Sequence, residues 1–205
     1  MTKTILITGG AGFVGSSLGI RLKGQYPEYQ VIALDNLKRR GSELNLTRLR
    51  EAGVTFVHGD IRNYEDFAAL PNVDAIIEAS AEPSVLAGVD GDPDYVINTN
   101  LVGTANCLKF ARKNDADFIF LSTSRIYPIA KLEQIAFVET ETRFGLSAEQ
   151  LVTGVSERGI SENFPIDGSR SFYGATKLCS ELLIEEYNQN YEADGRSDDK
   201  GHRRA

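Results

Sequence analysis

The sequence predicts an α/β fold built on a doubly wound parallel sheet with helices on both faces. Short apolar runs alternate with longer segments whose apolar residues recur at helical spacing, a pattern typical of parallel strands joined by right-handed crossovers. A glycine cluster separates the first apolar run from the first helical segment. Polar residues follow several of the apolar runs, at the carboxyl ends of the expected strands, where ligands of open α/β sheets bind.

The expected strands lie at residues 5–7, 30–35, 54–58, 73–81 and 117–121. The expected helices begin at Phe13 and at about residues 42, 93 and 172, and the last two end near 114 and 191. The stretch 128–170 has no sustained period, so we expect a long irregular insert with short ordered elements. Residues 1–191 form the predicted domain, and 192–205, which have almost no apolar residue, a disordered polar tail.

The composition narrows the class of protein. The chain has 205 residues, of which 41% are hydrophobic and 25% charged, as in ordinary globular proteins with a sizeable core. The net charge of −7 argues against a broad nucleic-acid surface, and no apolar run approaches the roughly 20 residues of a membrane helix. No signal-peptide pattern precedes the first strand, and Cys107 and Cys179 are expected to be buried thiols. We therefore expect a cytoplasmic protein without nucleic-acid or membrane partners, and no metal site.

The glycine cluster has the spacing G-x-x-G-x-x-G, at Gly9, Gly12 and Gly15. Glycines between a strand and a helix let the backbone approach a pyrophosphate, which then faces the positive end of the helix. Asp35 ends the second strand about 20 residues later, where an acid accepts hydrogen bonds from an adenosine ribose and disfavours NADP. The basic stretch 38–40 could instead hold a phosphate, and Asp35 could be a cap or turn residue.

Later polar residues extend the pattern. Asp60 ends the third strand and could contact adenine or cap the helix that follows. Thr123 or Ser124 would present a hydroxyl to a reacting substrate oxygen at the end of the fifth strand. Tyr173 and Lys177 are four residues apart, on one face of the last helix, and the lysine would lower the pKa of the phenol and make it a general base. An exposed helix face would give the same spacing.

In this order, the motifs resemble those of extended short-chain dehydrogenase/reductases, specifically the NAD-dependent sugar-nucleotide epimerase/dehydratase family. The resemblance covers nearly all of residues 1–190. Its matching stretches are T-G-G-A-G-F-V-G at 8–15, L-D-N-L at 34–37, G-D-I-R at 59–62, N-L-V-G-T at 100–104, S-T-S-R-I-Y at 122–127 and Y-G-A-T-K at 173–177.

The resemblance implies a Rossmann-like domain that binds NAD and acts on a nucleotide sugar. NAD would take a hydride from a sugar carbon and return it to the other face. Thr123 would orient the substrate hydroxyl, Tyr173 would act as base, and Lys177 would hold the nicotinamide ribose and tune Tyr173. The implied contacts to NAD are Gly9, Gly12, Phe13, Val14, Asp35, Asn36, Asp60, Ile61, Ala79, Ser80, Ala81, Asn100, Tyr173 and Lys177.

Within the family, segments 139–144, 159–162 and 170–177 resemble the CDP-paratose (CDP-tyvelose) 2-epimerase branch. The alternatives are a UDP-sugar 4-epimerase, a dehydratase, or an NAD-binding module without catalysis. Dehydratases usually have an Asp-Glu pair after the hydroxyl residue, where this chain has Ser124 and Arg125. The resemblance also implies a homodimer formed through the two long helices.

The chain departs from the family pattern in three ways. Glu78 stands where a histidine is usual, and Pro128 stands where a glycine is usual. The resemblance implies a sixth strand and a C-terminal substrate domain, which we expect this chain to lack. We therefore expect NAD binding to be retained and turnover to be impaired, since the sugar pocket would lack one wall.

Overall fold

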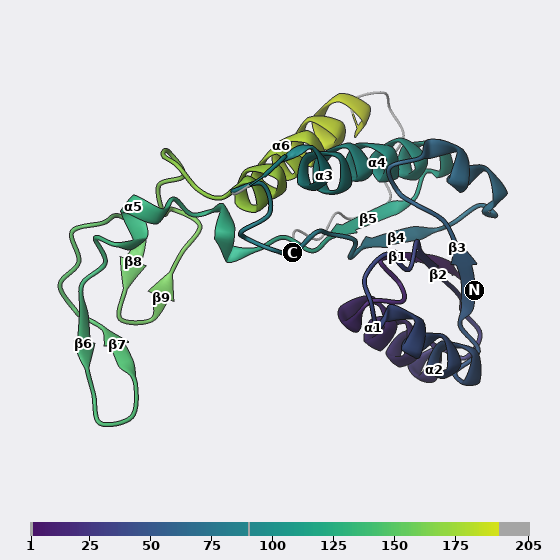
Figure 1. The fold of residues 1–205 in the computed structure, drawn as a ribbon, viewed down its shortest axis with the longest axis horizontal. Coiled ribbons are helices and arrows are strands. Elements are labelled where there is room, and N and C mark those ends of the chain that lie inside the picture. The colour runs from purple at the N-terminus through teal and green to yellow at the C-terminus, as the bar shows by residue number, and fades with distance from the viewer. Residues whose placement is uncertain (1, 90, 193–205) are drawn as a thin grey trace.

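The computed structural model describes residues 2–89 and 91–192 and has one five-stranded parallel sheet (Figure 1). The strand order is β3-β2-β1-β4-β5, so the chain winds outward in both directions from β1 and the predicted fold class is confirmed. Every neighbouring pair is parallel. The strands are β1 (Thr4–Thr8), β2 (Gln30–Asp35), β3 (Thr55–His58), β4 (Ala75–Glu78) and β5 (Asp117–Phe120).

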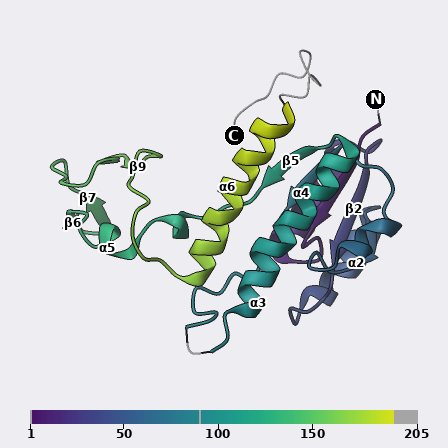
Figure 2. The ribbon, with the colours of Figure 1, turned by 90° about the horizontal axis from the view of Figure 1, so that it is seen from above.

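Helices cover both faces of the sheet (Figures 1 and 2). On one face lie α1 (Phe13–Gln25), in the first crossover, and α2 (Asn45–Glu51), which follows a short 3-10 turn, η1 (Ser42–Leu44), in the second crossover. On the other face lie α3 (Asp94–Ile97), α4 (Gly103–Asn114) and α6 (Phe172–Glu192), with the 3-10 segment η2 (Tyr64–Ala69) nearby. The last helix, α6, packs against α4 and the segment before it.

Alternate residues of β1 fill the two cores. Ile5 and Ile7 pack with Leu49 of α2 on one face, whereas Leu6 packs with Phe67 and Phe110 on the other. A strand covered on both faces has no polar side, because successive side chains point to opposite faces. This double burial explains why the strands read as continuous apolar runs.

Two elements differ from the sequence prediction. The helix expected from 93 to 114 contains a π-helical segment, η3 (Asn98–Val102), between α3 and α4. There the Asn100 carbonyl accepts bonds from the hydroxyls of Thr104 (2.6 Å) and Ser180 (3.3 Å), contacts invisible to apolar periodicity. The fourth strand ends at Glu78 rather than at residue 81, because its neighbour β1 ends opposite it at the glycine turn.

The insert 128–170 consists of short elements that extend away from the sheet (Figures 1 and 2). They are one helical turn, α5 (Ile129–Leu132), and two antiparallel hairpins, β6 (Phe137–Glu139) with β7 (Phe144–Leu146) and β8 (Val155–Ser156) with β9 (Gly159–Ile160). Apart from Glu192, at the end of α6, the predicted tail lies outside the described residues.

Two further observations concern side chains and membrane spans. Cys107 is buried as expected, but Cys179 is exposed on α6, so the expectation of two buried thiols is wrong for the second. Within residues 2–89 and 91–192, no helix has the length and apolar character needed to cross a membrane.

We expect Phe67→Ala to lower the free energy of unfolding by about 3–5 kcal/mol, because it leaves a cavity in the core. Phe67 is 1% exposed, and its ring lies 5.1 Å from that of Phe110. Chemical denaturation monitored by circular dichroism measures the change. Phe137→Ala is the matched control and should cost about 1 kcal/mol or less, because Phe137, at the start of β6, is 63% exposed. Equal costs for the two variants would contradict this assignment of the core.

Candidate functional site

A cleft of about 450 Å³ opens at the carboxyl ends of β1, β2, β3 and β4. This edge is where open parallel sheets bind ligands, since the loops to the helices separate there. The cleft is lined by most of the residues predicted to contact the cofactor, namely Gly9, Gly12, Asp35, Asn36, Asp60, Ile61, Ala79, Ser80 and Ala81.

The turn from β1 to α1 is so closely packed that a Cβ does not fit at Gly9, Gly10 or Gly15. Gly9 has a φ of +63°, and a Cβ there would lie 2.7 Å from the carbonyl oxygen of Ala79. A Cβ on Gly15 would overlap the carbonyl oxygen of Gly9. Gly12 has ordinary dihedral angles and immediately precedes α1, and its amide donates to Gly9 O at 3.0 Å. The turn therefore fits a cofactor whose pyrophosphate approaches the backbone closely.

The first turn of α1 offers both amides and apolar side chains. The N–H groups at the start of any helix have no partner within the helix, and they carry its positive dipole end. Phe13 is 86% exposed and Val14 is 47% exposed, although both are large and apolar. A ligand lying against this helix terminus would cover them.

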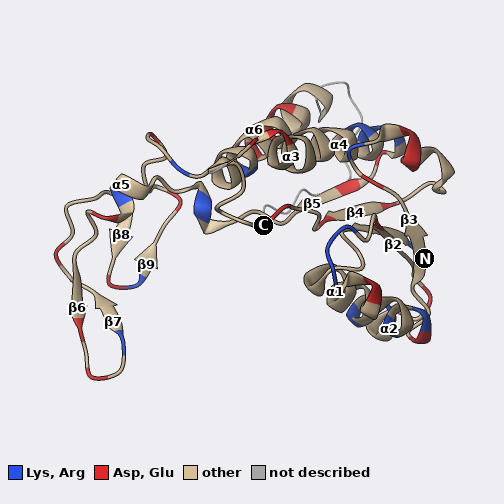
Figure 3. Cartoon of the chain, viewed as in Figure 1, with Lys and Arg blue, Asp and Glu red and all other residues tan. Residues whose placement is uncertain are grey.

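Asp35 connects the end of β2 to the glycine turn. Its carboxylate accepts hydrogen bonds from the amides of Ala11 (3.1 Å) and Leu37 (2.8 Å). A carboxylate has about four acceptor positions, so these two bonds leave capacity for ribose hydroxyls. The basic stretch 38–40 lines the same cleft, in the loop after β2 (Figure 3).

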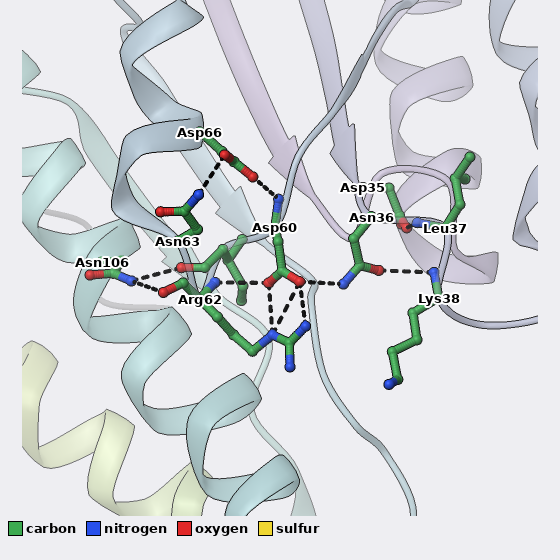
Figure 4. A network of polar contacts seen from close by, with 10 residues as sticks. Asp35, Asn36, Leu37, Lys38, Asp60, Arg62, Asn63, Asp66 and Asn106 are labelled. Carbon is green, nitrogen blue, oxygen red and sulfur yellow. Dashed lines mark hydrogen bonds and ion pairs between the residues drawn. The ribbon is translucent and has the colours of Figure 1, made fainter.

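Asp60 belongs to a polar network at the end of β3 (Figure 4). Arg62 forms an ion pair with it at 2.6 Å, and Asn36 Nδ2 donates to it at 2.9 Å. The hydrogen bond from Arg62 is the main reason that the pKa of Asp60 falls to about 2. Asn63 caps η2 by accepting from the amide of Glu65, so Asp60 does not act as the helix cap.

Asn100 is a buried residue that bonds a loop lining the cleft. It is 1% exposed, and its side-chain amide bonds both the N–H (2.8 Å) and the C=O (3.1 Å) of Glu82, in the loop after β4. It also donates to Thr176 Oγ1 at 3.2 Å, which connects this loop to α6. Asn100 therefore holds the loop 79–82 in place, and this loop lines the cleft.

The predicted catalytic hydroxyls come from two neighbouring segments. Thr123 caps a 3-10 turn, η4 (Ser124–Ile126), by accepting from the amide of Arg125 at 3.2 Å. A Cβ on Gly174 would overlap the carbonyl oxygen of Arg125, so the start of α6 lies directly against this turn. Tyr173 is thereby held beside the Thr123 turn. Thr123 also lines a second cavity of about 720 Å³ between this turn and the insert.

Lys177 is 2% exposed and points toward the ends of β4 and β5. Its ammonium donates to Leu121 O at 2.9 Å, lies 4.1 Å from the centre of the Phe120 ring, and lies 3.9 Å from a carboxylate oxygen of Glu78. Burial lowers the pKa of Lys177, and the negative charge of Glu78 opposes this shift. Glu78 was not among the predicted site residues, although an acid at the end of the apolar run 75–77 was a signal for it.

Comparison with known proteins assigns the family. The model of the "NAD dependent epimerase/dehydratase family" matches residues 5–197. The chain is 36% identical over 190 residues to a CDP-paratose 2-epimerase from Salmonella typhi, covering 89% of this chain and 52% of that protein. It is 28% identical to a dTDP-glucose 4,6-dehydratase from Mycobacterium tuberculosis, covering 91% and 49%. The chain thus spans about half the length of the curated relatives it matches.

Solved structures agree with this assignment. UDP-glucose 4-epimerase from Bifidobacterium longum, in complex with NAD+ and UDP, matches with a TM-score of 0.68 at 25% identity, over 91% of this chain and 49% of that one. A UDP-glucuronic acid 4-epimerase mutant from Bacillus cereus, also with NAD, matches with a TM-score of 0.66 at 25% identity, over 92% and 53%. The glycine turn, the strand order and these matches agree, and the chain belongs to the NAD-dependent epimerase/dehydratase family.

Proposed function

We propose that this chain holds NAD in the cleft at the glycine turn and takes part in the epimerisation of a nucleotide-diphosphate sugar. The observation that carries the proposal is that the glycine-lined cleft and the buried ammonium of Lys177 occur at the same edge of one sheet. When bound, NAD supplies a reversible acceptor for a hydride from a sugar carbon.

The binding roles follow from the geometry of the cleft. The amides at the start of α1 would donate to the pyrophosphate, and the exposed side chains of Phe13 and Val14 would be covered by the bound cofactor. Asp35 accepts from ribose hydroxyls with the acceptor positions that the turn leaves free. Asp60, whose charge is fixed by Arg62, lies with Ile61 at the adenine end of the cleft.

The catalytic roles use three side chains. Thr123 orients the reacting substrate hydroxyl, and Tyr173 accepts its proton. The ammonium of Lys177 stabilises the phenolate form of Tyr173 that accepts this proton, because an opposite charge nearby favours the ionised form. Return of the proton from Tyr173 completes the cycle without net consumption of the base.

A CDP-sugar is the proposed substrate, by similarity to the Salmonella typhi 2-epimerase. Ser124 and Arg125 follow Thr123 where dehydratases have an Asp-Glu pair, which supports an epimerase. A UDP-sugar 4-epimerase is the second candidate, and an NAD-binding module without turnover is the third. A homodimer through α4 and α6 and a place in the cytoplasm complete the proposal.

NAD should raise the melting temperature of the chain by several degrees at a concentration of about 100 times Kd, because ligand binding to the native state adds about 2.7 kcal/mol. Differential scanning fluorimetry measures the shift. Gly12→Val should abolish it, since Gly12 has ordinary dihedral angles and a larger side chain there enters the cleft.

Gly24→Val is the matched control, because no atom lies within 4 Å of a Cβ at Gly24, near the end of α1. This variant should keep the full shift with NAD. A Gly12→Val variant that melts like the wild type without NAD, yet shifts equally with it, would refute the proposed pyrophosphate site.

Tyr173→Phe should lower kcat for epimerisation at least about 100-fold, because it removes the group that accepts the substrate proton. The thermal shift with NAD should persist. Conversion of CDP-paratose and of UDP-glucose, followed by chromatography, distinguishes the two epimerase candidates.

Tyr187→Phe, further along α6 and packed edge to face against Tyr191, is the control and should retain activity. Equal activity of Tyr173→Phe and the wild type would exclude Tyr173 as the base. A wild-type chain that binds NAD and converts neither sugar would favour the binding-module alternative over these two epimerase activities.

A further inference from the structure

Glu78 is a fully buried carboxyl group beside Lys177. It ends β4, is 0% exposed, and accepts a long hydrogen bond (3.4 Å) from the hydroxyl of Thr104 on α4. The same oxygen lies 3.9 Å from the ammonium of Lys177. Its other carboxylate oxygen has no hydrogen-bond partner within the described residues. Such a group costs free energy to bury, so its place beside a catalytic residue calls for a role.

We propose that Glu78 is a positioning residue for Lys177, holding its ammonium at the ends of β4 and β5 and coupling the protonation of the two groups. The inference rests on the proposed function only where it extends to Tyr173, since the ion pair itself is a property of the chain. Leu121 O supplies one acceptor to Lys177, and Glu78 supplies the negative charge that keeps a buried ammonium protonated.

Among the groups that face Lys177, Glu78 supplies the principal negative charge. From α4, Cys107 contributes a thiol whose pKa is raised by burial well above its usual value, so it stays neutral. From α6, the carboxylate of Glu181 also acts on Lys177, but it accepts a hydrogen bond from Ser122 and is partly exposed. From β1, Thr8 contributes an uncharged hydroxyl.

The coupling gives the pair a distinctive pH dependence. Burial raises the pKa of Glu78 to about 7, against the opposing influence of Lys177. Glu78 is therefore protonated below neutral pH and ionised above it. Its ionisation raises the proton affinity of Lys177 and so opposes the lowering of the lysine pKa by burial. If Lys177 supports the phenolate of Tyr173, activity falls at the alkaline pH where Lys177 loses its proton, and ionised Glu78 moves that limit to higher pH.

Glu78→Gln tests the proposal, because the amide keeps the shape and removes the charge. Lysine labelled with ¹³C at Cε reports the titration of Lys177 by NMR, with Lys177→Met identifying the signal. In the wild type we expect a step near neutral pH from the ionisation of Glu78. The variant should lack this step, and its ammonium should titrate at least one pH unit lower, a tenfold loss of proton affinity.

Glu185→Gln is the matched control, since it removes an exposed negative charge from α6, the helix that carries Lys177. Its Lys177 titration should match that of the wild type. Equal Lys177 titrations in Glu78→Gln and Glu185→Gln would overturn the proposal, and Glu78 would then be only a structural residue. If Glu78→Gln does not fold, the wild type still decides: Glu78 Cδ and Lys177 Cε must share one titration step, and independent midpoints overturn the coupling.

These measurements need neither NAD nor substrate, so their failure differs from that of the proposed function. Loss of the step in Glu78→Gln without any NAD-induced thermal shift would support the pair and refute the proposed cofactor role. An NAD-induced thermal shift together with an unchanged Lys177 titration in Glu78→Gln would support NAD binding and refute the role of Glu78. Where turnover is measurable, the alkaline limit of the pH–rate profile should move to lower pH in Glu78→Gln.

Discussion

The close approach of the β1–α1 turn to the end of β4 is the constraint on which the rest of the site depends. Gly9 lies against the backbone of Ala79, and Gly15 lies against Gly9, so no side chain fits between these segments. The resulting packing fixes the start of α1, the end of β4 and the loop that follows it. The hydrogen bond from the amide of Ala11 to the carboxylate of Asp35 then connects the end of β2 to the same turn.

A set of buried hydrogen bonds connects this edge of the sheet to α6, the helix that carries Tyr173. Asn100 bonds the loop after β4 and also Thr176 of α6, and its carbonyl accepts from Ser180. These side chains are buried, so their hydrogen bonds have no competition from water and a lost partner would be costly. The π-helical turn at Asn100 is thus part of the link between the glycine-lined cleft and α6.

Features set by short-range pattern could be predicted from the sequence. The apolar runs of the strands, the turn at Gly9 and the start of α6 all depend on neighbouring residues and their periodicity. Features set by distant partners could not. The burial of Asn100, the ion pair between Glu78 and Lys177, and the π-helical turn depend on segments that meet only in the folded chain. Resemblance to a family supplied roles for Thr123 and Tyr173, but it did not indicate what a glutamate at position 78 would contact.

We infer that this chain by itself forms an NAD-binding cleft at the carboxyl edge of its sheet. Amide hydrogen exchange with and without NAD, resolved along the sequence, tests it most directly. With NAD bound, we expect slower exchange at 9–16, 35–37, 59–62 and 79–82, and unchanged exchange in the insert 128–170. Protection confined to the insert, or none at the glycine turn under saturating NAD, would contradict it.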